Sequence, residues 1–252
     1  MKNINAVVFS PTGNTMKITK LLLDEFREEH KIYDITPYGD YNNEMEFKEP
    51  TFFSFPVYVG RVPAVLAEKI KKYKGNNTPA IIISTIGNRH YDDALLEMKD
   101  LLIAQGFIPV TAGVFVAEHS IFHSVAKDRP DQEDLRYIEI FSEIIKDKLS
   151  AEELKVIEVK GKFPYKNEKG TLFKPLTDSS CVKCGTCAKH CPAEAIPFEN
   201  PDETIYDKCI SCMGCIHVCP VNARHLDKEK LEETEEIFHE KFHKRKNPVF
   251  FY

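Results

Sequence analysis

The 252-residue chain contains no tryptophan, and its first 180 residues contain no cysteine. It has no uninterrupted apolar run of about 18 residues, which argues against a membrane-spanning helix. The formal charge is −5, which argues against a strongly basic nucleic-acid-binding surface. The opening MKNINAVVFS carries one lysine and a short apolar run, too short for a secretory signal. The sequence therefore predicts a cytoplasmic protein with no membrane span and no nucleic-acid partner.

All eight cysteines lie between Cys181 and Cys219. A secreted protein held together by disulfides would spread its cysteines over the region they link, and would carry a signal peptide. In a reducing cytosol, a dense block of cysteines is typical of metal ligation. The distribution predicts two regions with different chemistry.

Residues 1–150 alternate short apolar runs with amphipathic stretches, which is typical of an α/β fold with a buried parallel sheet. Strands are expected at residues 5–10, 31–35, 51–56, 80–85 and 110–116. The pattern predicts a doubly wound, five-stranded parallel sheet.

Four helices are expected between and after these strands. The first carries Ile18, Leu22 and Phe26, and the second runs from Pro63 to Gly75 with Leu66, Ile70 and Tyr73. The third carries Leu95, Met98 and Leu102, with Asp92 as its cap and Gly106 as its end. The fourth begins at Pro130 and carries Leu135, Ile138, Ile145 and Leu149.

The pattern changes after residue 150. Residues 151–175 are rich in lysine and are expected to connect two domains across a surface, and residues 176–227 hold the cysteines. Residues 228–252 predict a C-terminal helix followed by the apolar tail NPVFFY. The tail is interpreted as a packed terminus, with a partner-docking segment as the alternative.

The cysteine region contains one internal repeat. CVKCGTCAKHCPAEAI at 181–196 matches CISCMGCIHVCPVNAR at 209–224 with an offset of 28. Each copy reads Cys-x2-Cys-x2-Cys-x3-Cys-Pro, the bacterial [4Fe–4S] pattern, in which the fourth cysteine ligates the other cluster. One cluster is predicted on Cys181, Cys184, Cys187 and Cys219, and the other on Cys209, Cys212, Cys215 and Cys191.

Zinc is the competing interpretation of these cysteines. A structural zinc site needs four ligands, usually in two pairs, and gives no reason for the third cysteine or the proline in both copies. His190 and His217 lie inside the repeats, but eight cysteines already fill every cluster corner, so both are interpreted as histidines that bind no iron. The region resembles the bacterial-type ferredoxins with two [4Fe–4S] clusters. The resemblance implies a domain that carries single electrons.

The first strand leads into a loop rich in hydroxyl groups and glycine: Ser10, Pro11, Thr12, Gly13, Asn14 and Thr15. An amphipathic helix follows, and free amides at a helix N-terminus suit a phosphate. The chain lacks G-x-x-x-x-G-K-[ST] and G-x-G-x-x-G, which disfavours ATP, GTP and a Rossmann dinucleotide. The alternative is a loop that only caps the helix. Its position after the first strand favours ligand binding.

This loop and the five-strand pattern look like a flavodoxin, whose phosphate loop binds FMN. With the ferredoxin-like region on the same chain, the whole resembles the flavodoxin–ferredoxin fusion proteins often called the EFR1 family, found mainly in anaerobes. The resemblance implies that two further loops hold the flavin ring. The candidate residues in those loops are Pro56, Val57, Tyr58, Gly60, Arg61, Thr85, Gly87, Asn88, Tyr91 and Asp92.

Tyr58 and Tyr91 are the candidates for stacking on the ring, since no tryptophan is present. Residues 117–120, after the fifth strand, are expected to close over the same edge of the sheet. The sequence leaves open whether the flavin faces a cluster of its own chain or of a second chain in a homodimer.

The favoured function is electron transfer through two [4Fe–4S] clusters and FMN, which couples one-electron to two-electron redox partner proteins. The acidic excess of residues 176–227, seven acidic against four basic, suits a basic partner. A second hypothesis is an FMN-dependent reductase of a small acceptor, in which Arg89, His119 or Tyr91 acts on the substrate. A third is a redox sensor that signals through its docking state.

Overall fold

Five parallel strands form the central sheet of the computed structural model, which describes residues 3–39, 41, 43–167 and 173–252. Their order is β2-β1-β4-β6-β7, and β10 lies antiparallel to β7 at the edge. The bounds are β1 Asn3–Val8, β2 Glu29–Asp34, β4 Thr51–Pro56, β6 Thr78–Ile86, β7 Phe107–Val116 and β10 Val249–Phe251. Numbered along the chain, the parallel strands follow the flavodoxin-like order 2-1-3-4-5. The predicted fold class is confirmed, with one antiparallel edge strand added.

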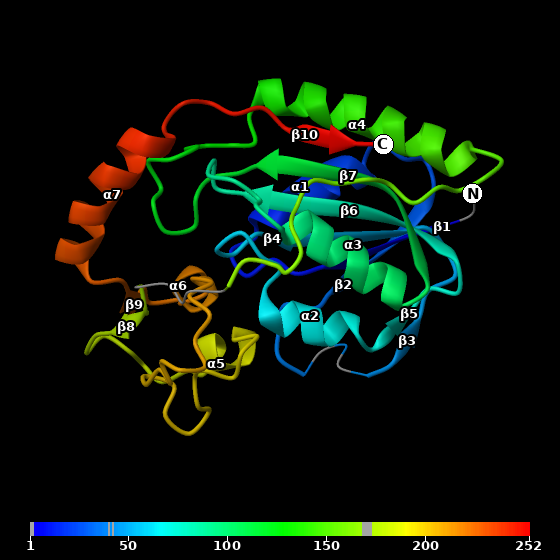
Figure 1. The fold of residues 1–252 in the computed structure, drawn as a ribbon. Helices are drawn as coiled ribbons and strands as arrows, with labels where there is room; N and C mark the ends of the chain where they lie inside the picture. Colours follow the sequence, from blue (N-terminus) through cyan, green and yellow to red (C-terminus); the bar gives the residue numbers. More distant parts are fainter. Residues whose placement is uncertain (1–2, 40, 42, 168–172) are drawn as a thin grey trace.

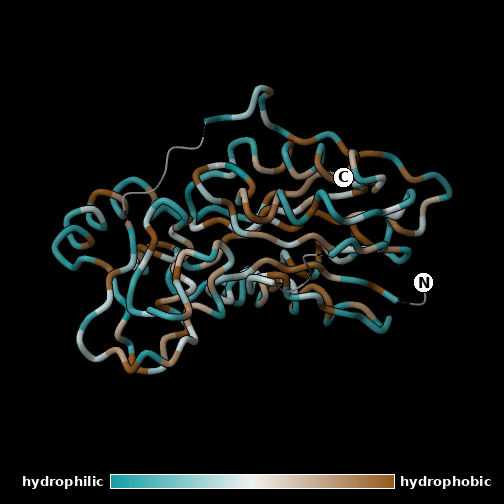
Figure 2. Tube along the Cα trace, turned by 90° about the horizontal axis from the view of Figure 1, so that it is seen from below, coloured by the Kyte–Doolittle hydropathy of each residue, from teal (hydrophilic) through white to brown (hydrophobic). Residues whose placement is uncertain are grey.

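Helices cover both faces of the sheet (Figure 1). Leu66 and Leu95 pack in one hydrophobic cluster on one face, and Ile18 and Phe141 pack in a second cluster on the other. These side chains come from α2 (Ala64–Ile70), α3 (Ala94–Ala104), α1 (Asn14–Leu23) and α4 (Gln132–Ser150), respectively. Hydrophobic stretches run through the middle of these layers (Figure 2). The carboxyl ends of the strands therefore meet at one edge of a rigid, doubly covered sheet.

Two predicted helices are shorter than expected. α1 ends at Leu23, so Phe26 lies beyond it, although its ring still packs edge-on against Phe52. α2 ends at Ile70 because Tyr73 begins β5 (Tyr73–Lys74), which pairs with β3 (Met45–Glu46) in a separate parallel pair. The apolar spacing of the second predicted helix continues into a strand. Periodicity alone does not distinguish the end of the helix from the start of that strand.

The caps of the other two helices differ slightly from expectation. Asp93, not Asp92, stands at the N-cap of α3, and its carboxylate accepts the amides of Lys162 and Lys166 at 2.9 and 2.8 Å. Gly106, with φ of +78°, follows the end of α3 as predicted. α4 begins after Asp131, which forms a capping box with Asp134.

The cysteine-bearing region, called here the cysteine module (residues 176–227), lies beyond the carboxyl edge of the sheet (Figure 1). Its elements are β8 Leu176–Thr177, α5 Thr186–His190, α6 Gly214–His217 and β9 Arg224–His225, and α7 Lys228–Phe242 follows. β8 and β9 pair antiparallel and bring the two ends of the module together. Within the described ranges, no helix combines the length and hydropathy needed to cross a bilayer.

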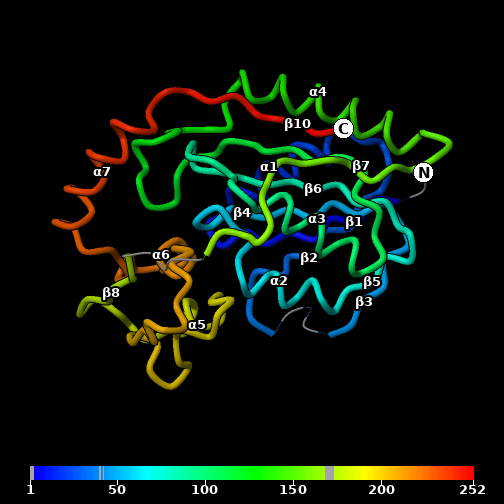
Figure 3. The backbone as a smooth tube through the Cα atoms, in the orientation of Figure 1, coloured from blue at the N-terminus to red at the C-terminus, as the bar shows by residue number. Residues whose placement is uncertain are grey.

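The last ten residues, called here the C-terminal strap (residues 243–252), return from α7 to the sheet (Figure 3). The Asn88 side-chain amide donates to the Lys244 carbonyl at 2.8 Å, and Arg129 donates to the Lys246 carbonyl at 2.8 Å. The ring of Phe250, on β10, stacks on Phe141 with centroids 4.6 Å apart. The apolar tail is therefore a packed terminus.

We predict that Phe250→Ala lowers the free energy of unfolding by about 2 kcal/mol. The loss is smaller than for a fully buried phenylalanine, because the Phe250 ring is only half-buried. Chemical denaturation of the two proteins measures this difference. Tyr252→Ala is the matched control, because Tyr252 is 70% exposed, and its effect should stay within about 0.5 kcal/mol. Equal losses in both variants would contradict the packing of β10.

Candidate functional site

Two small cavities divide the eight cysteines of the module into two sets of four. Cys181, Cys184, Cys187 and Cys219 line one cavity, called here the distal site. Cys191, Cys209, Cys212 and Cys215 line the other, called here the proximal site. Each set takes three cysteines from one repeat and the fourth from the other, which is the crossed grouping that the spacing predicts. All eight cysteines are free of disulfides.

Backbone turns within each repeat bring three cysteines around one cavity. Lys183 and Gly185 in the first repeat have φ of +53° and +75°, and Ser211 and Met213 in the second have +53° and +62°. Left-handed residues reverse the chain sharply between successive cysteines. Gly185 and Met213 are also the N-caps of α5 and α6, so each third cysteine lies in the first turn of a short helix.

The proximal site is a small thiol-lined cavity with amides directed at its sulfurs. The Ala195 amide donates to Cys191 Sγ at 3.3 Å, and the Ser211 amide donates to Cys209 Sγ at 3.4 Å. Burial raises the pKa of the Cys215 thiol to about 12. Such sulfurs ionise when they bind a metal. Among the described residues no three ligand side chains are grouped for a single metal ion, whereas each cavity is bounded by four sulfurs. The donor set, the enclosure and the amides suit a [4Fe–4S] cluster.

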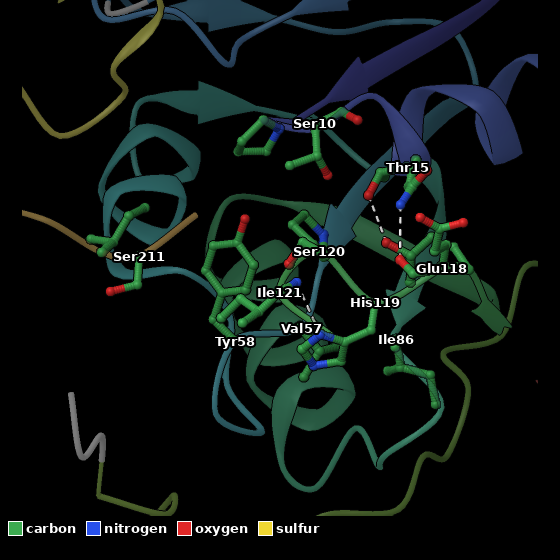
Figure 4. A pocket seen from close by; sticks show the side chains of 18 of the residues that line it. Ser10, Thr15, Val57, Tyr58, Ile86, Glu118, His119, Ser120, Ile121 and Ser211 are labelled. Atoms are coloured by element: carbon green, nitrogen blue, oxygen red, sulfur yellow. Dashed lines mark hydrogen bonds between the residues drawn. The ribbon is translucent and has the colours of Figure 1, made fainter. Parts of the chain in front are cut away.

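A third and larger cavity lies at the carboxyl edge of the sheet and has about 720 Å³ of space not filled by atoms, its open mouth included. We call it the edge cavity (Figure 4). Loops after four parallel strands line it, together with two residues of the cysteine module. The lining residues are Ser10, Pro11, Thr12, Asn14, Thr15, Pro56, Val57, Tyr58, Val59, Thr85, Ile86, Gly87, Ala117, Glu118, His119, Ser120, Ile121, Ile210 and Ser211.

The loop after β1, where the sequence predicts phosphate binding, is called here the anion-binding turn. Gly13, with φ of +81°, stands at the N-cap of α1. The Met16 amide donates to Ser10 Oγ at 2.9 Å, and the Lys17 amide donates to the Gly13 carbonyl at 2.9 Å. In the part of the chain that the structure describes, the Asn14 and Thr15 amides have no protein acceptor. These amides and the Thr12 hydroxyl are available to a phosphate.

Tyr58 stands on the loop after β4, between the edge cavity and the proximal site. Its amide and carbonyl bond to those of Arg61 around a tight turn of Val59 and Gly60, which have φ of +53° and +85°. Desolvation raises the pKa of the Tyr58 phenol well above its usual value, and the neighbouring Cys212 raises it further. Of the two predicted stacking residues, Tyr58 lines the edge cavity and Tyr91 does not.

His119 contributes a neutral imidazole to the cavity wall. Its Nδ1 accepts the amides of Ile121 and Phe122, both at 3.1 Å, so its proton resides on Nε2. Burial lowers the pKa of His119 to about 4, with a smaller contribution from His123. Near neutral pH the side chain is an uncharged hydrogen-bond donor. The sequence predicts residues 117–120 near this edge and names His119 as one candidate to act on a substrate in the reductase hypothesis.

Several predicted flavin-binding residues lie outside the lining of the edge cavity. Arg61 makes a two-bond ion pair with Glu97, and Asp92 accepts bonds from Arg89 and Lys166. The charged side chains of these loops form ion pairs with residues of α3 and of the connecting segment. Sequence spacing does not predict such pairs.

Gly60, Asn88, Tyr91 and Gly13 are also absent from the cavity lining. A Cβ on Gly60 would lie 2.3 Å from the Asp92 carboxylate, so its role there is close packing. Asn88 is engaged by the C-terminal strap, and Tyr91 is buried with its ring edge-on to Phe251. Gly13 shapes the anion-binding turn without lining the cavity itself.

Sequence reasoning did not predict Ile121 in the cavity lining, and it missed the contribution of the cysteine module, Ile210 and Ser211, entirely. These two module residues lie between Cys209 and Cys212, about 200 residues from the loop after β1. The module reaches that loop directly, because His190 Nε2 lies 2.9 Å from the Pro11 carbonyl and donates to it. No local pattern could have predicted this contact, since it depends on how the two parts of the chain pack.

The chain is similar to known iron–sulfur proteins over one quarter of its length. Residues 162–224 match the family described as a 4Fe-4S dicluster domain. Over 63 residues it is 46% identical to pyruvate synthase subunit PorD of Methanocaldococcus jannaschii, covering 23% of this chain and 73% of that one. Over 67 residues it is 42% identical to a ferredoxin of Alicyclobacillus acidocaldarius, covering 25% and 83%, respectively.

Among solved structures, an FMN-dependent NADH-azoreductase from Bacillus anthracis aligns with 60% of this chain and all of its own, at 9% identity and a TM-score of 0.39. The PorD subunit and the ferredoxin match at 46% and 42% identity over most of their own length. The chain thus belongs, through residues 162–224, to the 4Fe-4S dicluster ferredoxin family, and it joins that domain to a sheet of flavodoxin-like strand order.

Proposed function

We propose that the protein transfers electrons between a redox partner protein and FMN bound in the edge cavity, through [4Fe–4S] clusters at the distal and proximal sites. The observation that carries this proposal is the position of Ile210 and Ser211. They connect two cysteines of the proximal site and also line the edge cavity. A cluster and a flavin would then lie on the two sides of one short loop.

The cavity fits FMN by the chemistry of its walls. At one side, free amides and hydroxyl groups after β1 suit the phosphate, although the loop carries no charged side chain. Elsewhere Tyr58, Val57 and Ile210 offer aromatic and apolar surface for a flat ring. When bound, clusters exchange one electron at a time and FMN exchanges one or two.

The two cysteine sites differ in exposure, which gives the path an order. Cys184 of the distal site is exposed and Val182 beside it is 64% exposed, whereas Cys191, Cys212 and Cys215 of the proximal site are buried. An external protein therefore reaches the distal site first. Lys183 there pairs with Asp202 at 2.9 Å. The module as a whole carries seven acidic and four basic residues, and this acidic excess favours a basic partner.

The cavity offers one of the three groups suggested for a reductase. His119 lines the edge cavity, whereas Arg89 and Tyr91 do not. This favours the carrier hypothesis over a substrate-reducing enzyme. Because free thiols and iron–sulfur ligation suit a reducing compartment, we place the protein in the cytoplasm.

The cluster assignment predicts the metal content and the electron route. Anaerobically reconstituted wild-type protein should contain about eight iron and eight sulfide per chain, and Cys184→Ala or Cys212→Ala should each remove about half. Rapid mixing with a reduced dicluster ferredoxin should reduce bound FMN at least about tenfold more slowly in Cys184→Ala than in wild type. Dithionite reduction of FMN serves as the control and should remain complete. Stoichiometric zinc, or unchanged reduction by ferredoxin in Cys184→Ala, would contradict the assignment.

The phosphate loop predicts a selective loss of FMN affinity. Thr12→Ala should weaken FMN binding by about tenfold or more, since a hydrogen bond to a charged group contributes about 1.5–3 kcal/mol. Riboflavin, which has no phosphate, should bind both proteins equally. Quenching of flavin fluorescence measures both affinities, and Thr234→Ala on α7 is the control, because Thr234 does not line the edge cavity. Equal losses for FMN and riboflavin would place the phosphate elsewhere.

A further inference from the structure

Ser211 carries a buried hydroxyl that the folded chain leaves without a partner. The residue is 5% exposed, and its Oγ makes no hydrogen bond to any described residue. A buried polar atom is normally paired, and leaving it unpaired lowers stability. Ser211 is also one of the residues that line the edge cavity, so a molecule bound there lies next to this hydroxyl.

The loop around Ser211 holds this hydroxyl in place. Cys209 and Cys212 of the proximal site flank it, and its own amide donates to Cys209 Sγ at 3.4 Å. Its φ of +53° is a left-handed conformation that serine rarely adopts, so the turn fixes the direction of the side chain. Because an iron ligand stands on each side of Ser211, the loop would be rigid once a cluster is bound.

The surroundings of Ser211 indicate which part of a ligand it meets. Figure 4 shows Ser211 near Tyr58 on one side of the cavity, with Thr15 and Glu118 on the other. Ile210 and Tyr58 supply apolar and aromatic surface on the Ser211 side, whereas the anion-binding turn lies by Thr15. The Ser211 side therefore suits a flat heteroaromatic ring with polar atoms at its edge, rather than a phosphate.

We propose that Ser211 is a flavin-binding residue, whose hydroxyl makes a hydrogen bond to the polar edge of the ring. The inference rests on the proposed function and adds to it that a cluster-ligating loop forms part of the flavin site. Ser211 would then touch both redox groups, through its amide on the Cys209 sulfur and through its hydroxyl on the ring.

The test compares Ser211→Ala with Thr177→Val in protein that holds its clusters. Thr177 is the matched control because its hydroxyl is also buried and unpaired among the described residues, yet it stands on β8 and does not line the edge cavity. Ser211→Gly is a second variant, since glycine adopts the left-handed conformation without strain. Iron content confirms that the clusters are retained.

Flavin fluorescence titrations give the affinities, and thermal unfolding gives the stability of flavin-free protein. We expect Ser211→Ala and Ser211→Gly to raise the dissociation constants of FMN and riboflavin by the same factor, about tenfold for one hydrogen bond. The flavin-free variants should be at least as stable as wild type, because the unpaired hydroxyl is gone. Thr177→Val should leave both affinities unchanged.

Wild-type affinity for flavin in both Ser211 variants would overturn the inference while leaving the proposed function intact. A loss of stability in flavin-free protein that parallels the loss of affinity would also overturn it, because Ser211 would then be structural. A wild-type protein that binds neither FMN nor riboflavin would instead overturn the proposed function itself.

Discussion

The arrangement of the molecule depends on the contact between the proximal cysteine loop and the carboxyl edge of the sheet. In a doubly wound sheet this edge is where ligands bind, because loops from several parallel strands end there together. Here the module closes one side of that edge: His190 bonds to the Pro11 carbonyl, and Ile210 and Ser211 complete the cavity wall. The cavity is therefore shared by two parts of the chain.

The C-terminal strap and α7 hold that contact together from the far side. Phe238 of α7 packs against the rings of His119 and Phe122, directly behind the cavity wall. The strap then bonds to Asn88 and to Arg129, whose guanidinium forms a buried ion pair with Asp134. The module has one small hydrophobic cluster of its own and shares a second with residues 121–125 and α7. These shared contacts fix its position, and binding of the iron–sulfur clusters would add to its stability.

Much of this could be predicted from the sequence, because the relevant signals are local. Cysteine spacing determined the crossed grouping, and apolar runs located all five parallel strands. The anion-binding turn followed from residue types at a strand–helix junction. The roles of Arg61, Asn88 and Tyr91 could not be predicted, because their partners Glu97, the strap and Phe251 are distant in sequence. From sequence alone, loop residues at the carboxyl edge of the sheet give the same signal whether their side chains face a ligand or neighbouring residues.

The difference between local signals and contacts that are distant in sequence also explains why sequence reasoning missed Ile210 and Ser211. Ser211 lies between two cysteines of a metal-binding motif, whose spacing assigns roles only to the cysteines. Ser211 also lines the edge cavity because of how the module packs. The side of the proximal loop that faces away from the cysteines lies toward the sheet. A loop that must bend sharply around a cluster exposes its intervening side chains on the opposite side, and here the opposite side is the edge cavity. The geometry that binds the cluster therefore also shapes the proposed flavin site.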